Sequence, residues 1–202
     1  MTENKNETLW SENVIVVDVE YVDRVVFDLI VNFERMLGRK IPAADLARWV
    51  DYLALDGGMK PGGDTSVAVV LVHDKSSEGF ENFVPASFSE LDGKAFSDHL
   101  GEFVFSSVPV EKLMTKADLL LDIVQAAAGA TEVKRLMVVP DSDDGNCYES
   151  LRHVLRLTDD DKRITLFAMQ PMPGGNFRQE ILGYSLMQAL GISAAELDAQ
   201  MQ

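Results

Sequence analysis

Short runs of consecutive apolar residues, separated by amphipathic segments, constrain this chain more than any other feature of its sequence. Val14–Val17 and Ser66–His73 are apolar almost throughout, which is typical of strands that are covered on both faces. Val22–Leu37 and Thr115–Ala128 repeat apolar residues at three- and four-residue spacing, the pattern of helices that bury one face. The alternation predicts an α/β fold, a three-layer α/β/α sandwich with a mainly parallel central sheet.

The other segments complete a single α/β domain over residues 1–202, with a core of about residues 14–169 and C-terminal helices in 177–201. We expect those apolar C-terminal helices to cover the sheet, the alternative being a dimer seam. The remaining predicted elements are a helix opened by Pro42, an edge strand at Phe83-Val84, a short helix around Ala95–Leu100, strands at Phe103–Phe105, Arg135–Val139 and, last, Ile164–Met169, a helix started by Asn146 with Glu149, and closing helices at Phe177–Leu190 and Ser193–Met201.

The charge balance restricts the partners of the chain. Asp and Glu total 33 and Lys and Arg 18, so the formal net charge is −15. This charge repels nucleic-acid backbones and anionic membranes, so a nucleic-acid partner needs a local basic patch or bridging divalent cations. The sequence contains no clear Lys/Arg cluster. Its single cysteine, a polar beginning and the lack of a long apolar run predict a cytoplasmic protein with no membrane partner.

Acidic residues follow the predicted strands. Asp18 ends the first strand, the strand Arg135–Val139 leads to Asp141 and Asp143, and the helix after Thr115 carries Asp118 and Asp122. Ligands of open parallel sheets bind beyond the carboxyl ends of the strands, where the strand order reverses. Carboxylates gathered there suit Mg²⁺ or Mn²⁺. The alternative is that these acids cap helices or favour helix dipoles.

The order of these motifs resembles the NYN branch of the PIN-like nucleases, a PIN-like/Rossmann-like fold, over about residues 14–169. The matching segments are Asp18 with Glu20 after the first strand, Lys116-Ala117-Asp118 opening a helix, and the turn Asp141-Ser142-Asp143. The resemblance implies divalent-metal-dependent cleavage of RNA phosphodiesters, with RNA bound through a local metal site. It assigns catalytic roles to Asp18, Asp118, Asp141 and Asp143, and metal ligation to these four residues and Asp122.

The sequence departs from that pattern at several positions. At the positions where the family usually has Gly and Asn in its first motif, this chain has Val19 and Tyr21. In the turn it has Pro140 where a Gly is usual and Asp144 where a Phe is usual. The departures favour a second hypothesis, a non-catalytic PIN-like/Rossmann-like module that binds a protein partner or a second copy of itself.

A third hypothesis is an aspartate-nucleophile phosphatase, because the chain also resembles the haloacid dehalogenase type. In that case Asp18 attacks phosphorus while Asp141 and Asp144 hold Mg²⁺.

One glycine-rich segment has no place in these hypotheses. Residues 57–64 read Gly-Gly-Met-Lys-Pro-Gly-Gly-Asp and lack the Gly-Lys-Ser/Thr of a phosphate-binding loop. We therefore interpret the segment as a flexible connector.

Overall fold

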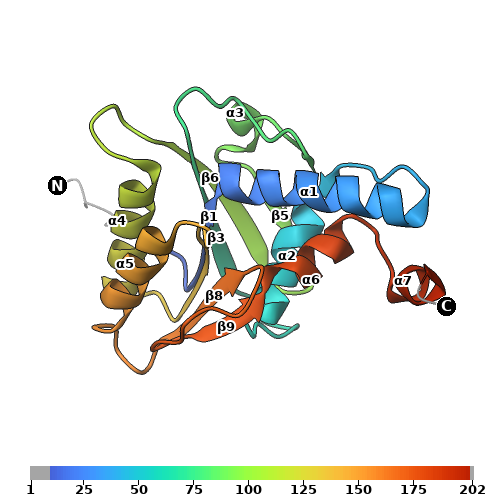
Figure 1. Ribbon diagram of the computed structural model, residues 1–202. Coiled ribbons are helices and arrows are strands. Elements are labelled where there is room, and N and C mark those ends of the chain that lie inside the picture. The colour runs from blue at the N-terminus through green and yellow to red at the C-terminus, as the bar shows by residue number, and fades with distance from the viewer. Residues whose placement is uncertain (1–9, 201–202) are drawn as a thin grey trace.

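A computed structural model describes residues 10–200, and its architecture is the expected three-layer α/β/α sandwich with a mainly parallel sheet (Figure 1). The elements in chain order are β1 (Asn13–Asp18), α1 (Val19–Leu37), β2 (Ala44–Asp45), α2 (Leu46–Asp56), β3 (Ser66–His73), β4 (Phe83–Val84), α3 (Phe88–Leu91), β5 (Ala95–Ser97), β6 (Glu102–Pro109), α4 (Lys116–Gly129), β7 (Arg135–Val139), α5 (Gly145–Leu155), β8 (Arg163–Ala168), β9 (Arg178–Ile181), α6 (Leu182–Ala189) and α7 (Ala194–Gln200).

The seven-stranded sheet has the order β5-β6-β3-β1-β7-β8-β9. Every neighbouring pair is parallel except β5, which runs antiparallel to β6 at one edge. In chain order, β3 and then β6 are added on one side of β1, and β7, β8 and β9 are then added on its other side. The order therefore reverses between β1 and β7, where open α/β sheets form a ligand crevice.

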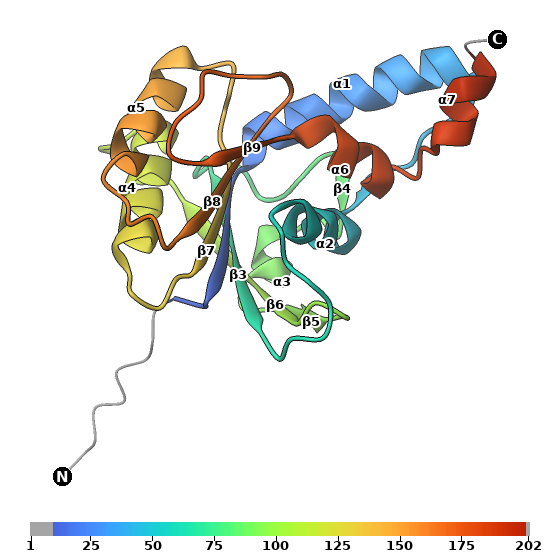
Figure 2. The same cartoon turned by 90° about the horizontal axis from the view of Figure 1, so that it is seen from below.

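Alternate residues of β1 pack into the two helical layers. Ile15 and Val17 belong to a core shared with α1, α2 and α6, whereas Val14 and Val16 belong to a core shared with α4 and α5. Figure 2 shows these two groups of helices on opposite sides of the sheet. Since the strand is buried on both faces, its apolar run needs no alternation.

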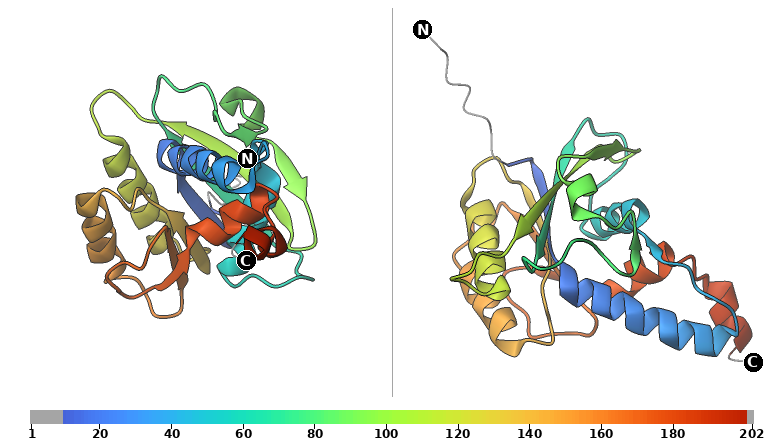
Figure 3. Two further views of the ribbon diagram at one scale, coloured as in Figure 1. Left: turned by 45° about the vertical axis from the view of Figure 1, so that its right-hand side comes forward. Right: turned by 90° about the horizontal axis from the view of Figure 1, so that it is seen from above.

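The C-terminal helices cover apolar surface. Leu182 and Leu186 of α6 are fully buried in the core that α6 shares with α2 and the sheet. In the right-hand view of Figure 3, α1 extends well beyond the sheet, and α7 lies beside its far end. The side chains of Arg39 and Glu196 join the two there at 2.8 Å.

Two segments that we expected to be helical are strands. Residues 178–181 form β9, which pairs with β8 from Thr165–Arg178 onward, and α6 begins only at Leu182. Residues 95–97 form β5, which pairs with β6. In both segments pairing with an otherwise open strand edge satisfies the backbone groups, and tertiary context overrides the local helical pattern. Consequently β8 is not the last strand.

Two predicted helix starts also differ from the structure. Helix α2 begins at Leu46 instead of near Pro42, because the Asp45 side chain accepts the Arg48 amide. Helix α5 is capped by Asp144 and not by Asn146. Asp accepts amide hydrogen bonds at an N-cap as readily as Asn does.

None of the helices within residues 10–200 has the length and apolar character required to cross a bilayer.

Candidate functional site at the carboxyl ends of the strands

Asp18 lies at the reversal point of the sheet. It ends β1 and caps α1, since its Oδ1 accepts the Tyr21 amide at 3.0 Å. Its side chain is only 4% exposed. Burial raises the pKa of Asp18, and the nearby Lys116 ammonium opposes that rise.

Lys116, the first residue of α4, joins two carboxylates. Its Nζ lies 2.8 Å from Asp18 Oδ1 and 2.8 Å from Glu20 Oε2. Glu20 also accepts hydrogen bonds from the Asp74 amide at 3.0 Å and the Ser77 hydroxyl at 2.7 Å. Although burial raises the pKa of Glu20, the hydrogen bonds from Lys116, Ser77 and Asp74 lower it overall.

The two carboxylates in turn keep Lys116 charged. Burial alone lowers the pKa of an ammonium, yet Asp18 and Glu20 raise that of Lys116 above its ordinary value. Lys116 is therefore an internal counter-ion for the end of β1.

In the turn after β7, an aspartate side chain accepts hydrogen bonds from backbone amides of the same turn. Asp141 Oδ1 accepts the amides of Asp143 at 3.0 Å and Asp144 at 3.3 Å. The Arg24 guanidinium lies 3.5 Å from both Asp141 and Asp143. A cation from α1 thus partly balances this turn as well.

A buried hydroxyl pair ties the same turn to α1. Tyr21 Oη and Ser142 Oγ are 2.6 Å apart, and both residues are buried. Burial raises the pKa of Tyr21. Tyr21, which stands where the resemblance expects Asn, therefore has a packing and bridging role.

The two acids of α4 differ in their surroundings. Asp118 forms a reciprocal capping box with Thr115, whose hydroxyl lies 2.7 Å from Asp118 Oδ2. Hydrogen bonds from that hydroxyl and from the Thr115 amide lower the pKa of Asp118. Asp122 is exposed on the next turn.

Several of the predicted acids raise the pKa of one buried thiol, that of Cys147. Burial, and after it the carboxylates of Asp144, Asp18, Asp141 and Asp118, raise the pKa of Cys147 to about 12. Because β1 and β7 are parallel neighbours, Asp18 and Asp141 lie at the same edge of the sheet. The neutral thiol is a packing group and not a nucleophile.

The predicted ligands nevertheless do not fit a shared Mg²⁺ or Mn²⁺. Across residues 10–200, no three of Asp18, Asp118, Asp122, Asp141 and Asp143 bring ligand oxygens within 4.8 Å of one another. Asp18 already binds Lys116, and Asp118 already binds Thr115. Divalent cations need several free oxygens around one point.

A comparison with known families places the chain. The model of DUF6621, described as a family of unknown function, matches residues 7–197. The chain belongs to the DUF6621 family. Neither the curated proteins nor the solved structures contain a significant match to it.

This DUF6621 family member has one group with the spacing of metal ligands in residues 10–200, and it contains none of the predicted ligands. It consists of Asp51 on α2 with Asp98 and His99 after β5. The Asp51 side chain is 18% exposed, and its buried Oδ1 has no hydrogen-bond partner. Burial and the neighbouring Asp98 raise the pKa of Asp51 to about 6.

Sequence reasoning missed this second group of the DUF6621 family member for a definite reason. We predicted residues 95–100 as a helix, whereas residues 95–97 form a strand. Only the pairing of β5 with β6 brings that turn beside α2. The adjacent Asp98-His99 pair was the one signal in the sequence.

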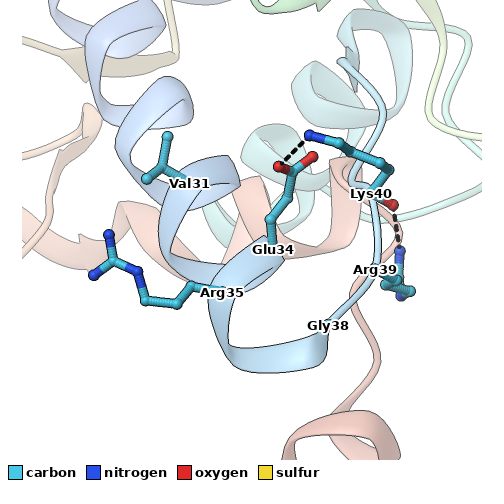
Figure 4. Close-up of a pocket in the computed structure, with 6 residues that line it drawn as sticks. All are labelled: Val31, Glu34, Arg35, Gly38, Arg39 and Lys40. Atoms are coloured by element: carbon cyan, nitrogen blue, oxygen red, sulfur yellow. Dashed lines mark hydrogen bonds and ion pairs between the residues drawn. The ribbon is translucent and has the colours of Figure 1, made fainter.

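A cavity of about 450 Å³ at the end of α1 offers no comparable chemistry (Figure 4). Its Glu34 already accepts Lys40 at 2.9 Å and the Ile41 amide at 3.0 Å. The lining comes from one continuous segment, residues 31–40. We therefore place the candidate site of this DUF6621 family member at the reversal point of the sheet.

Proposed function

We propose that this DUF6621 family member is a non-catalytic PIN-like/Rossmann-like module that acts by binding another protein. The observation that carries the proposal is the Lys116 ammonium, 2.8 Å from the carboxylates of both Asp18 and Glu20. A metal-dependent nuclease needs such carboxylates for its cation. Here a side chain of the same chain supplies the positive charge.

The burial of Asp18 supports the same proposal. With 4% of its side chain exposed and its Oδ1 shared by Lys116 and the Tyr21 amide, Asp18 offers little surface to a substrate. A nucleophile or a metal ligand must contact the reacting group or its ion. This argues against the phosphatase as well as the nuclease.

The partner that suits this edge is a basic protein. Asp122 and Asp144 are exposed, and the Asp143 side chain is 68% exposed. Among the described residues, Asp122 and Asp144 form no ion pair, and Asp143 pairs only with Arg24, which also pairs with Asp141. Electrostatic complementarity to such an edge steers a cationic surface and speeds its association.

The absence of catalysis is tested with an RNA cleavage assay in Mn²⁺ or Mg²⁺. We expect the intact chain and the Asp18→Asn variant to give the same background. Metal-dependent cleavage that disappears in Asp18→Asn overturns the proposal.

The acidic edge is tested with a lysine-rich peptide as a probe at low salt. We expect Asp122→Asn/Asp143→Asn to bind it several-fold more weakly than Asp159→Asn/Asp160→Asn does, although both variants remove two exposed charges. If the two double variants bind the peptide equally weakly, the net charge of the chain alone explains the binding, and the proposed role of this edge is overturned.

A second candidate is the divalent-metal-dependent ribonuclease that the NYN resemblance implies. The position of Asp18 and Asp141 after two neighbouring parallel strands, at the reversal point of the sheet, favours it. It requires Lys116 to leave the carboxylates, and the same cleavage assay decides between the two candidates.

A further inference from the structure

The amino ends of the strands, opposite the acidic edge, enclose a cavity of about 510 Å³. Its volume lies within the range of small-molecule sites in proteins. Three strands contribute their first residues, namely Arg135 of β7, Arg163 of β8 and Arg178 of β9. Lys60 and Lys162 complete a set of five cations, which we call the basic pocket.

The basic pocket is unusual in a chain of this composition. Five of only 18 Lys and Arg residues line one cavity, although the formal net charge is −15. Along residues 10–200, Arg178 is the one member of the five in an ion pair, with Glu180 at 2.8 Å. Most of this positive charge has no carboxylate in contact.

The cations also act on one another. Burial lowers the pKa of Arg135, and the positive charges of Arg163 and Arg178 lower it further, while Glu12 opposes them. Like charges held together cost free energy that a bound anion relieves. Two of the five cations hydrogen-bond to backbone carbonyls, since Arg135 donates to the Gly57 carbonyl and Lys162 to the Ala130 carbonyl.

The glycine-rich segment makes room for two of the guanidinium groups. Gly58 has φ +86°, and a Cβ there would lie 3.1 Å from Arg135 Nη1 and 3.5 Å from Arg178 Nη1. A Cβ at this position would press on the Arg135 guanidinium and would touch that of Arg178 at ordinary van der Waals distance. The segment that we interpreted as a connector thus forms one wall of the basic pocket.

We propose that the basic pocket binds a small molecule of nucleotide size through its phosphate groups, in contact with Arg135, Arg163 and Arg178. Guanidinium groups bind phosphate with two parallel hydrogen bonds. Phe177 and Asn176 line the same cavity and offer an apolar ring and an amide to the remainder of the ligand. This proposal does not depend on the proposed function.

The test is calorimetric titration of the intact chain with ATP and, separately, with inorganic triphosphate. Because the phosphate groups make the contact, we expect both probes to bind with Kd below about 1 mM. We expect Arg163→Ala/Arg178→Ala to weaken both at least about tenfold, since each removed residue loses a charge-assisted contact. Circular dichroism shows that the variant remains folded.

The matched control is Arg35→Ala, which removes an exposed arginine at the far end of α1. We expect it to bind both probes as the unaltered chain does. The proposal is overturned by absent binding at millimolar concentration, by binding unchanged in the double variant, or by equal weakening in Arg35→Ala. Binding of an RNA oligomer with no binding of ATP or triphosphate also overturns it.

Discussion

The two ends of the sheet balance charge in different ways. At the carboxyl end, Lys116 and Arg24 contact the acids of β1 and of the turn after β7. At the amino end, Arg135 and Lys162 contact backbone carbonyls, and charge remains without carboxylates. Helix dipoles favour acids at helix N-termini and cations at C-termini. The dipoles therefore account for the sign of the charge at each end of the sheet, but not for the presence of side-chain counter-ions at one end only. The difference teaches that acids at the carboxyl end are balanced within the chain, whereas most cations at the amino end have no carboxylate in contact.

The largest expected effect is at the carboxyl end. Lys116→Met leaves the buried Asp18 carboxylate without its counter-ion, and we expect the free energy of unfolding at pH 7 to fall by about 3 kcal/mol. Urea denaturation measures it. The comparison breaks if the loss is below about 1 kcal/mol, which is the usual worth of an exposed pair.

Two controls separate charge from packing. Lys75→Met removes the Lys75–Glu111 pair, whose side chains are 58% and 73% exposed, and we expect little change. Asp18→Asn/Lys116→Met keeps an N-cap oxygen and removes both charges of the buried pair, while Glu20 keeps its hydrogen bonds from the Asp74 amide and the Ser77 hydroxyl. We expect this double variant to recover most of the lost stability.

Asp51 allows the comparison with a carboxylate that, unlike Asp18, has no lysine in contact. Its pKa of about 6 lies above the ordinary 3.8, so the folded state binds its proton more tightly than the unfolded state does. The stability contributed by this proton is complete below about pH 4 and is lost as pH rises through about 6. We expect Asp51→Asn to stabilise the chain at pH 8 by about 1–2 kcal/mol, allowing for solvent screening.

The measurement is the free energy of unfolding from pH 4 to pH 8. Asp51→Asn should flatten the profile between about pH 4 and pH 6. A loss of stability in Asp51→Asn at pH 8 contradicts the expectation.

The sequence predicts much of the fold because its strongest patterns are local. The apolar run Val14–Val17 and the cap at Thr115 both indicate their elements without knowledge of their neighbours. Residues 178–181 and 95–97 were predicted wrongly, since partner strands distant in the chain decide their conformation. Edge pairing is a tertiary property and leaves little local signal.

The same limit applies to the sites. Asp18 and Asp141 could be placed at one edge because both follow parallel strands, but the contact of Lys116 with Asp18 depends on side-chain reach. The basic pocket was invisible, since Arg135, Arg163 and Arg178 are far apart in the chain. They become neighbours only because β7, β8 and β9 begin at the same edge.

A smaller effect sharpens the comparison at the amino end. Gly58 and Gly62 have φ +86° and +94°, so alanine at either position should cost about 1 kcal/mol of stability. A Cβ at Gly62 meets no atom within 4 Å, whereas one at Gly58 meets two guanidinium groups. If the basic pocket binds phosphate, Gly58→Ala weakens ATP binding in calorimetry and Gly62→Ala does not. Equal binding by the two variants contradicts this use of Gly58.

The smallest expected effect has the opposite sign to that of Lys116. Arg163 is exposed and repels Arg135, so Arg163→Ala should raise the free energy of unfolding by up to about 0.5 kcal/mol at low salt. Because salt screens exposed charges, the gain should vanish in about 0.5 M NaCl. Arg35→Ala removes a cation that favours the C-terminal dipole of α1 and should instead cost a few tenths of a kcal/mol. If Arg163→Ala destabilises the chain as Lys116→Met does, the cations at both ends are structural and the amino end has no surplus charge for a ligand.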